Sequence, residues 1–148
     1  MLLPRMEIRP FRAGDDVAAH VAAIYDEFGL GFDSAFEDDL FDIAGVYAHG
    51  EFWVVEAAGR IVATAGVVPH GGTRLIKRIY VAADARRHGL ARQLLRRCAA
   101  FGTFSRTELW SDVRFRSAHQ LYLSEGFRFG HTRVLEDPDG SVERYFSR

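Results

Sequence analysis

The sequence has little of what builds disulfide frameworks, metal centres or membrane spans. Its 148 residues include 1 cysteine, so no disulfide forms within the chain and a reducing compartment suits it. The 6 histidines show no His-x-x-x-His spacing with a third ligand, so we predict no metal. No apolar run approaches the roughly 20 residues of a membrane-spanning helix. Residues 1–5 lack the apolar core of a signal peptide, so we expect a cytoplasmic protein with no membrane partner.

Net charge is also small, at −1, but the charges are unevenly distributed. Residues 1–70 contain 4 Lys or Arg against 12 Asp or Glu, whereas residues 71–148 contain 15 against 8. A basic half suits a polyphosphate ligand or a nucleic acid. The chain has no helix-turn-helix, zinc-finger or ribonucleoprotein signature, so we expect no nucleic-acid partner, and a nucleic-acid-binding module is kept as an alternative.

What the sequence does contain is the pattern of one α/β domain over residues 1–148, with 48% hydrophobic and 26% charged residues. Alternating or β-rich runs predict strands at 7–12, 52–57, 60–68, 75–81, 107–113, 127–134 and 142–146. Apolar periodicity and capping residues predict helices at 17–28, 90–99 and 117–125, and a short one that begins at Ser34 with capping-box spacing. Gly66 inside the third strand indicates a bulge or a close backbone approach.

The chain is organised around residues 75–101, where a strand, a basic loop and a helix follow one another. Leu75 to Val81 is apolar and rich in β-formers. From Leu90 onward the apolar residues recur with the period of a helix. The shared face consists of Leu90, Ala91, Leu94, Leu95, Cys98 and Ala99. Cys98 is therefore interpreted as a buried small hydrophobe and not as a reactive nucleophile.

The loop between this strand and helix places Arg86, Arg87 and His88 at the positive end of the helix dipole. Each cation there costs up to roughly 1 kcal/mol, where an acidic residue would stabilise the helix. An anion between the arginines and the unpaired amides of the first turn would remove this conflict. Gly89, without a side chain, would let a phosphate approach the backbone. We therefore predict an anion site, with a solvated basic loop as the alternative.

Two motifs in this order resemble those of the Gcn5-related N-acetyltransferases, the GNAT superfamily. Val81 followed by residues 86–91 resembles the acyl-CoA-binding signature (Gln/Arg)-x-x-Gly-x-(Gly/Ala). Residues 118–122 (Ala-His-Gln-Leu-Tyr), followed by Gly126 and Phe127, are similar to Ala-x-x-Leu-Tyr-x-x-x-Gly-Phe. The resemblance covers nearly the whole chain. It implies a GNAT-like mixed, mostly antiparallel sheet of about seven strands flanked by about four helices.

The resemblance also implies acetyl-CoA as co-substrate, without a metal. It places the pantetheine arm between the fourth and fifth strands, where they part and leave backbone groups of residues 79–81 unpaired. An amide-bearing arm can pair with such groups as an added strand would. The implied cofactor-binding residues are Ile79, Tyr80, Val81, Arg86, Arg87, His88, Gly89, Leu90, Ala91 and Arg92.

Tyr122 matches the family's proposed general acid. A tyrosine hydroxyl with a pKa of about 10 stays protonated at neutral pH and can protonate a departing thiolate. Two residues depart from the family pattern: Leu75 stands where many relatives have a glutamate, and Phe115 stands where an asparagine is frequent. The general base is therefore unassigned. Its candidates are Asp112, Glu51, His70 and a water chain.

We thus expect an N-acetyltransferase that acetylates a primary amine of a small molecule or peptide by direct attack in a ternary complex. The alternative is a non-catalytic acyl-CoA-binding or nucleic-acid-binding module on the same fold. Seven carboxylates lie between Asp26 and Asp42, on segments that border the acceptor side in this family. They favour a cationic acceptor, although solvation of two helices explains them equally well. The sequence leaves a homodimer open.

Overall fold

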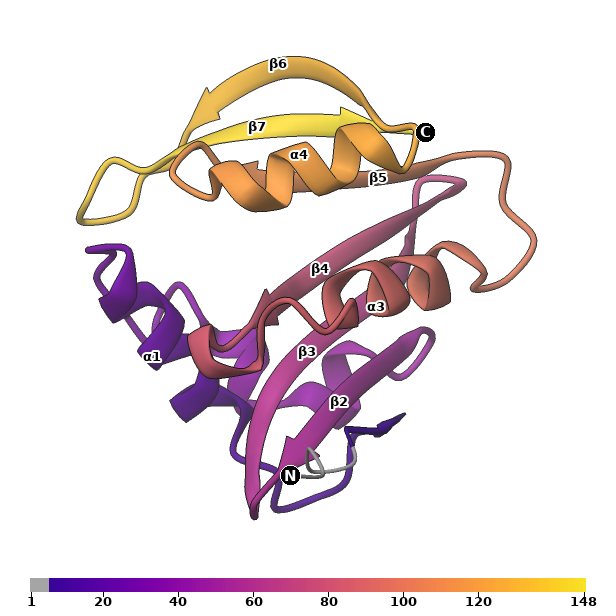
Figure 1. Ribbon diagram of the computed structural model, residues 1–148. Coiled ribbons are helices and arrows are strands. Elements are labelled where there is room, and N and C mark those ends of the chain that lie inside the picture. The colour runs from indigo at the N-terminus through magenta and orange to yellow at the C-terminus, as the bar shows by residue number, and fades with distance from the viewer. Residues whose placement is uncertain (1–5) are drawn as a thin grey trace.

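Seven strands form one sheet in the order β1-β2-β3-β4-β5-β7-β6 in the computed structural model, which describes residues 6–148 (Figure 1). The strands are β1 (Ile8–Pro10), β2 (Glu51–Ala57), β3 (Arg60–His70), β4 (Thr73–Val81), β5 (Thr107–Asp112), β6 (Arg128–Val134) and β7 (Val142–Ser147). The helices are α1 (Val17–Glu27), α2 (Ile43–Val46), α3 (Leu90–Ala99) and α4 (Arg116–Ser124), with 3₁₀ turns η1 (Asp38–Phe41) and η2 (Ala83–Ala85). The predicted fold class is confirmed.

One strand pair determines where the sheet opens. β4 and β5 are parallel, whereas the other neighbouring strands are antiparallel. They pair only from Arg74↔Thr107 to Ile76↔Leu109. β4 then continues to Val81 while β5 diverges with β7, so residues 77–81 have no strand partner on that side (Figure 1). The sheet therefore splays at its centre, as the resemblance implied.

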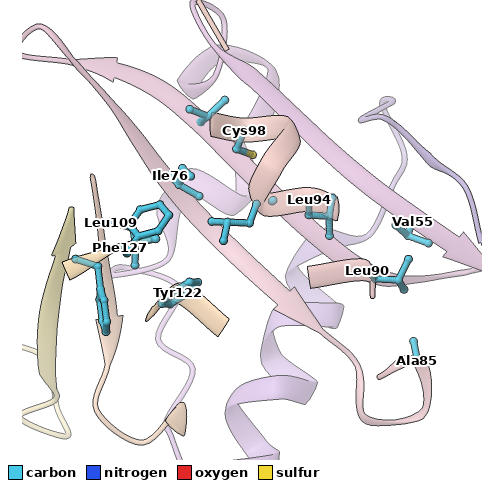
Figure 2. Packing of buried hydrophobic residues seen from close by; sticks show 14 of the residues in the cluster. Val55, Ile76, Ala85, Leu90, Leu94, Cys98, Leu109, Tyr122 and Phe127 are labelled. Atoms are coloured by element: carbon cyan, nitrogen blue, oxygen red, sulfur yellow. The ribbon is translucent and has the colours of Figure 1, made fainter. Parts of the chain in front are cut away.

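Two hydrophobic clusters cover the two faces of the sheet. On one face, α3 buries Leu90, Leu94 and Cys98, which recur every fourth residue along one side of the helix (Figure 2). α4 joins the same cluster through Tyr122. On the other face, α1, η1 and α2 build a second cluster around residues such as Val21. The first cluster spans both halves of the sheet, from Val55 of β2 to Phe146 of β7, whereas the second lies on the half that contains β1 to β4.

The segment after α1 differs from the prediction. The expected helix does not begin at Ser34, because residues 34–36 form a turn and η1 begins only at Asp38. The side chain of Asp33 accepts the Ala35 N–H at 2.9 Å. An Asp side chain that bonds the backbone two residues ahead forms a local turn that competes with a helix N-terminus. The predicted short helix is consequently divided into η1 and α2.

The pairing of β3 with β4 is irregular beside Gly66. Thr64 pairs with Tyr80 and Gly66 with Lys77, so Ala65 of β3 faces two residues of β4, Arg78 and Ile79. The extra residue of this bulge lies in β4, next to the Gly66–Lys77 pair and not in the strand of the glycine that indicated it. At Gly66 itself the close approach comes from a ring, because an added Cβ would lie 2.5 Å from a ring carbon of Tyr47.

Candidate functional site

A cavity of about 890 Å³ lies where β4 and β5 diverge. Residues 75–81 of β4 line it on one side, and residues 109–112 of β5 with residues 116–118 of α4 line it on the other. The segment that follows α1 contributes acidic residues, and Arg86 and Arg87 contribute the basic loop. The splay of the sheet thus brings together the acidic and basic parts of the sequence.

Two contacts bridge the walls of this cavity. The Gly31 N–H donates to Oδ2 of Asp139 at 2.7 Å, which joins the segment after α1 to the turn between β6 and β7. The rings of Phe28 and Phe115 meet edge to face, with centroids 4.8 Å apart. Phe115, at the N-cap of α4, therefore helps to connect the two halves of the sheet.

The bulge in β4 turns one backbone amide toward the cavity. The Thr64 hydroxyl donates to the carbonyl oxygen of Arg78 at 2.8 Å, so this carbonyl points toward β3. No peptide bond among residues 6–148 is cis, and in a trans peptide the carbonyl and the next N–H point in opposite directions. The N–H of Ile79 therefore points away from β3, to the side that β5 has left, and Ile79 lines the cavity.

Arg78 holds an unusual backbone conformation at this point. Its φ is +57°, in the left-handed region that costs a residue with a Cβ roughly 1–2 kcal/mol. Its side chain compensates by entering a buried polar network. Nε and Nη2 donate to the two carboxylate oxygens of Asp39 at 3.0 and 2.5 Å, and Nη1 donates to the Tyr25 hydroxyl at 3.0 Å. A guanidinium buried to 11% side-chain exposure needs such partners.

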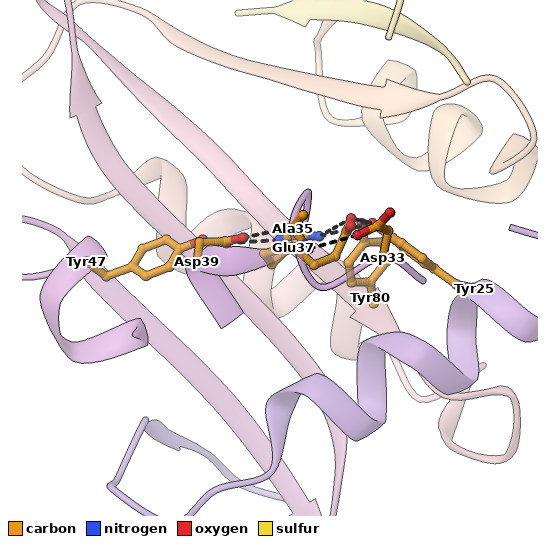
Figure 3. A network of polar contacts seen from close by, with 8 residues as sticks. Tyr25, Asp33, Ala35, Glu37, Asp39, Tyr47 and Tyr80 are labelled. Carbon is orange, nitrogen blue, oxygen red and sulfur yellow. Dashed lines mark hydrogen bonds and ion pairs between the residues drawn. The ribbon is translucent and has the colours of Figure 1, made fainter. Parts of the chain in front are cut away.

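Tyrosines complete this network. The Tyr25 hydroxyl donates to Oε1 of Glu37 at 2.8 Å, and the Tyr47 hydroxyl donates to Oδ2 of Asp39 at 3.0 Å (Figure 3). Burial raises the pKa of both tyrosines, so both hydroxyls stay protonated and donate. Burial alone would raise the pKa of Asp39 as well, but the hydrogen bonds and charge of Arg78 lower it below the ordinary value. Asp39 is therefore ionised at neutral pH.

The basic loop is more exposed to solvent than the Arg78 network. Nη1 and Nη2 of Arg86 bind the two carboxylate oxygens of Glu27 at 2.5 and 2.7 Å, and Nε donates to the Val81 carbonyl at 3.0 Å. Arg87 has φ of +67°, and Gly89 is the N-cap of α3 with φ of +75° and no side-chain cap. The first amides of α3 therefore face a segment without a capping side chain.

Only some of the ten predicted cofactor-binding residues line the cavity. Six of them line it: Ile79, Tyr80, Val81, Arg86, Arg87 and Ala91. The other four belong to the loop and helix around it: His88, Gly89, Leu90 and Arg92. Leu90 is buried in the core, and Arg92 donates to Glu125 at 2.7 Å. The pyrophosphate site on this loop stays a prediction.

Tyr122 belongs to both the core and the cavity. It lines the cavity, and its ring also packs against Phe127 and Phe146 in the core, with 2% exposure. Burial raises the pKa of Tyr122, against a smaller opposite effect from its hydrogen bond with Ser111. Ser111 also bonds Nε2 of His119 at 3.0 Å. The hydroxyl is therefore protonated at neutral pH, as a proton donor must be.

The three candidate bases differ in their positions. Asp112 lines the cavity, but both of its oxygens accept from Arg114, at 3.0 and 3.1 Å. His70 is 67% exposed and bonds Glu108 through Nδ1 at 3.0 Å. Neither His70 nor Glu51 is among the residues that line the cavity. The base stays unassigned, and a water chain stays a candidate.

Cys98 does not line the cavity. Cys98 is fully buried in the core, and burial raises the pKa of its thiol to about 12. Among residues 6–148, no group of His, Cys, Asp and Glu is placed to hold a metal ion. None of the helices described is long and apolar enough to cross a membrane.

Sequence reasoning did not identify the Arg78 network. The available signal was Lys77-Arg78, two consecutive cations in a central strand, because a cation there requires a buried partner. Its partner Asp39 lies 39 residues earlier, within an acidic segment that also contains exposed carboxylates. Spacing alone does not distinguish the buried member of that segment from the solvated ones.

Three comparisons with known proteins agree with this geometry. Residues 48–129, more than half of the chain, match the family model described as an acetyltransferase (GNAT) domain. A mouse protein named probable N-acetyltransferase family 8 member 5 is 32% identical over 103 residues, which are 62% of this chain and 45% of that protein. The chain thus spans about half the length of this curated relative.

Solved structures share the fold. An acetyltransferase of the GNAT family from Staphylococcus aureus Mu50 superposes with a TM-score of 0.83 at 21% identity, covering 97% of this chain and 98% of that one. An acetyltransferase from Streptococcus agalactiae gives a TM-score of 0.78 at 22% identity, covering 97% of each chain. The likeness extends over the splayed sheet and both of its faces.

Proposed function

Since the chain belongs to the GNAT acetyltransferase family, we propose that the protein is an acetyl-CoA-dependent N-acetyltransferase. It transfers the acetyl group to a primary amine of a small molecule or peptide by direct attack in a ternary complex. The observation that carries this proposal is the Ile79 amide, which points into a cavity opened by the splay of β4 and β5.

The residues present fit acetyl-CoA. The edge of β4 that faces the cavity lacks a strand partner over residues 77–81, so its backbone groups can pair with the amides of pantetheine. Arg86 and Arg87 supply positive charge beside the uncapped start of α3, where a pyrophosphate gains both charge and amide donors. Gly89 keeps that approach free of a side chain.

In the reaction, the Ile79 N–H donates to the thioester carbonyl oxygen as negative charge develops on it. A preorganised amide costs no reorganisation at this moment, so it stabilises the transition state more than the ground state. The amine nitrogen forms a bond to the carbonyl carbon, and the carbon–sulfur bond breaks. The Tyr122 hydroxyl gives its proton to the departing thiolate. The proton that the amine loses leaves through a base that is still unassigned, or through water.

A cationic amine is the proposed acceptor class. Asp33, Glu37 and Asp38 line the cavity from the segment after α1, whereas Arg86 and Arg87 line it from the basic loop. Arg78 pairs with both Asp39 and Glu37, with its Nη1 lying 3.5 Å from Oε1 of Glu37, so these two carboxylates contribute less to the field than the sequence indicated. The remaining acidic wall attracts a positively charged amine, while the basic loop attracts the phosphates of acetyl-CoA.

Calorimetry with acetyl-CoA followed by a thiol-release assay over a panel of amines tests the proposal. The panel holds polyamines, aminoglycosides, basic peptides with free N-termini and acidic amino acids. Binding with amine-dependent thiol release supports the enzyme. Binding without release by any amine supports the alternative, a non-catalytic acyl-CoA-binding module. No binding would contradict both. A cytoplasmic location and a homodimer stay predictions.

A further inference from the structure

We infer that Asp39 is a positioning residue, which acts through Arg78 to hold the Ile79 amide in the orientation that faces the cavity. This inference rests on the proposed function, because the orientation of the amide matters only if a thioester carbonyl binds there. It concerns residues outside both sequence motifs. It also gives Asp39 a role that differs from the electrostatic role proposed for the exposed carboxylates of the same segment.

The first observation is the conformation that has to be held. Arg78 adopts φ of +57° in the middle of a strand, where its neighbours in β4 are extended. A residue with a Cβ leaves this region readily unless other contacts hold it there. A return of Arg78 to extended backbone would rotate the peptide between Arg78 and Ile79, and with it the amide that faces the cavity.

The second observation is that two contacts hold this peptide from both ends. On the backbone, the Thr64 hydroxyl holds the Arg78 carbonyl at 2.8 Å. On the side chain, Asp39 holds the guanidinium by two hydrogen bonds, at 3.0 and 2.5 Å. The bidentate geometry fixes the direction as well as the distance of the side chain, which a single point contact would not do.

The third observation is that Asp39 is itself held rigidly. The Tyr47 hydroxyl donates to its Oδ2 at 3.0 Å, and the carboxylate has a side-chain exposure of 9%. Tyr47 is anchored in turn in the hydrophobic cluster under α1. The contacts therefore run from the core through Tyr47 and Asp39 (Figure 3) to Arg78, and end at the backbone of the bulge.

The test compares Asp39→Asn with Asp38→Asn. Both variants remove one negative charge from the same cavity wall, but only Asp39 binds Arg78, since Asp38 is exposed on the same turn. We expect Asp39→Asn to lower kcat at least tenfold more than Asp38→Asn does. KM for acetyl-CoA should stay within about twofold of wild type, because the amide interaction strengthens only in the transition state.

A spectroscopic measurement separates positioning from an effect on the acceptor. Acetyl-CoA labelled with a heavy isotope at the thioester carbonyl is bound to each variant without an amine, and its carbonyl stretch is recorded by difference infrared spectroscopy. A hydrogen bond from Ile79 lowers this frequency in the wild type. In Asp39→Asn the band should return toward that of free acetyl-CoA, and in Asp38→Asn it should stay at the wild-type position.

Thr64→Val provides a second variant in case Asp39→Asn does not fold. It keeps the shape of a fully buried side chain and removes only the hydroxyl that holds the Arg78 carbonyl. It should lower kcat and shift the carbonyl band in the same direction as Asp39→Asn. An unshifted band in both variants that fold would overturn the inference, as would wild-type kcat in Asp39→Asn.

Failure of the proposed function would look different. If the wild-type protein does not bind acetyl-CoA, the infrared experiment has no signal in any variant and the proposed function is wrong. The positioning contact is then tested by the NMR coupling constant that reports φ of Arg78. Retention of a positive φ in Asp39→Asn would overturn the inference on its own, and its loss would support it.

Discussion

The two charged borders of the cavity are built in opposite ways. At the basic border, Arg86 is 37% exposed and binds Glu27, while Gly89 at the N-cap has no side chain to bond the amides of α3. At the acidic border, Arg78 and Asp39 are nearly buried and fully engaged with each other and with tyrosines. A border that binds and releases a charged ligand has to keep its donors accessible. A border that fixes a backbone conformation needs a hydrogen-bond partner for each of its buried polar groups.

Tyr122→Phe tests the chemistry between these two borders and should have the largest effect. The substitution keeps the aromatic ring of Tyr122, so packing against Phe127 and Phe146 should change little. Loss of the proton donor should lower kcat by ~10² where chemistry limits the rate, with acetyl-CoA affinity nearly unchanged. Single-turnover kinetics and calorimetry measure the two quantities. A wild-type single-turnover rate in Tyr122→Phe would show that Tyr122 has a purely structural role.

Gly89→Glu tests the basic border and should have the next largest effect. The new side chain adds a negative charge and strain at φ of +75°, beside the amides of α3. Acetyl-CoA affinity should fall at least tenfold, which is about 1.4 kcal/mol. Gly59→Glu, at a positive φ in the turn between β2 and β3, is the matched control for strain and added charge. Equal affinity of the two folded variants for acetyl-CoA would contradict the assignment of the pyrophosphate site to this loop.

How well the sequence predicts each border depends on how far apart in the sequence the contacting residues lie. The basic loop, α3 and Tyr122 lie within short motifs, so local pattern and resemblance were sufficient to locate them. The acidic border depends on pairs such as Asp39 with Arg78 and Gly31 with Asp139, which are 39 and 108 residues apart. No local pattern encodes such distances. The helix predicted from Ser34 was wrong for a related reason, since Asp33 formed a turn that the capping-box spacing does not reveal.

The pH dependence of the free energy of unfolding tests whether the buried Asp39 at the acidic border is ionised and paired. Because the pKa of Asp39 is lowered in the folded protein, the unfolded chain takes up its proton first as the pH falls. The carboxylate therefore contributes stability above its ordinary pKa of 3.8, and this contribution is lost as the pH falls through the lowered folded value. Urea unfolding at several pH values should show the difference between wild type and Asp39→Asn narrowing below about pH 4, by an amount on the order of 1 kcal/mol. A constant difference down to pH 2 would contradict an ionised, paired Asp39.

The effect of ionic strength on kcat/KM should be the smallest, and it tests whether the acceptor is cationic. Asp38 is exposed and lines the cavity, whereas Asp26 is exposed on α1 and is not among the lining residues. For a cationic acceptor, kcat/KM should fall as salt rises, because exposed charges are screened over ~8 Å at physiological ionic strength. Asp38→Asn should reduce kcat/KM at low salt by about two- to threefold and flatten the salt dependence.

Asp26→Asn removes the same charge outside the cavity and should leave that dependence close to wild type. The comparison therefore separates a local field at the acceptor wall from the net charge of the whole acidic half. Asp39 is unsuitable for this purpose, because its charge is already paired with Arg78 and its removal disturbs the bulge. If the best acceptor in the amine panel is anionic, steering by this wall is the wrong explanation. The exposed carboxylates would then serve only to solvate the segment.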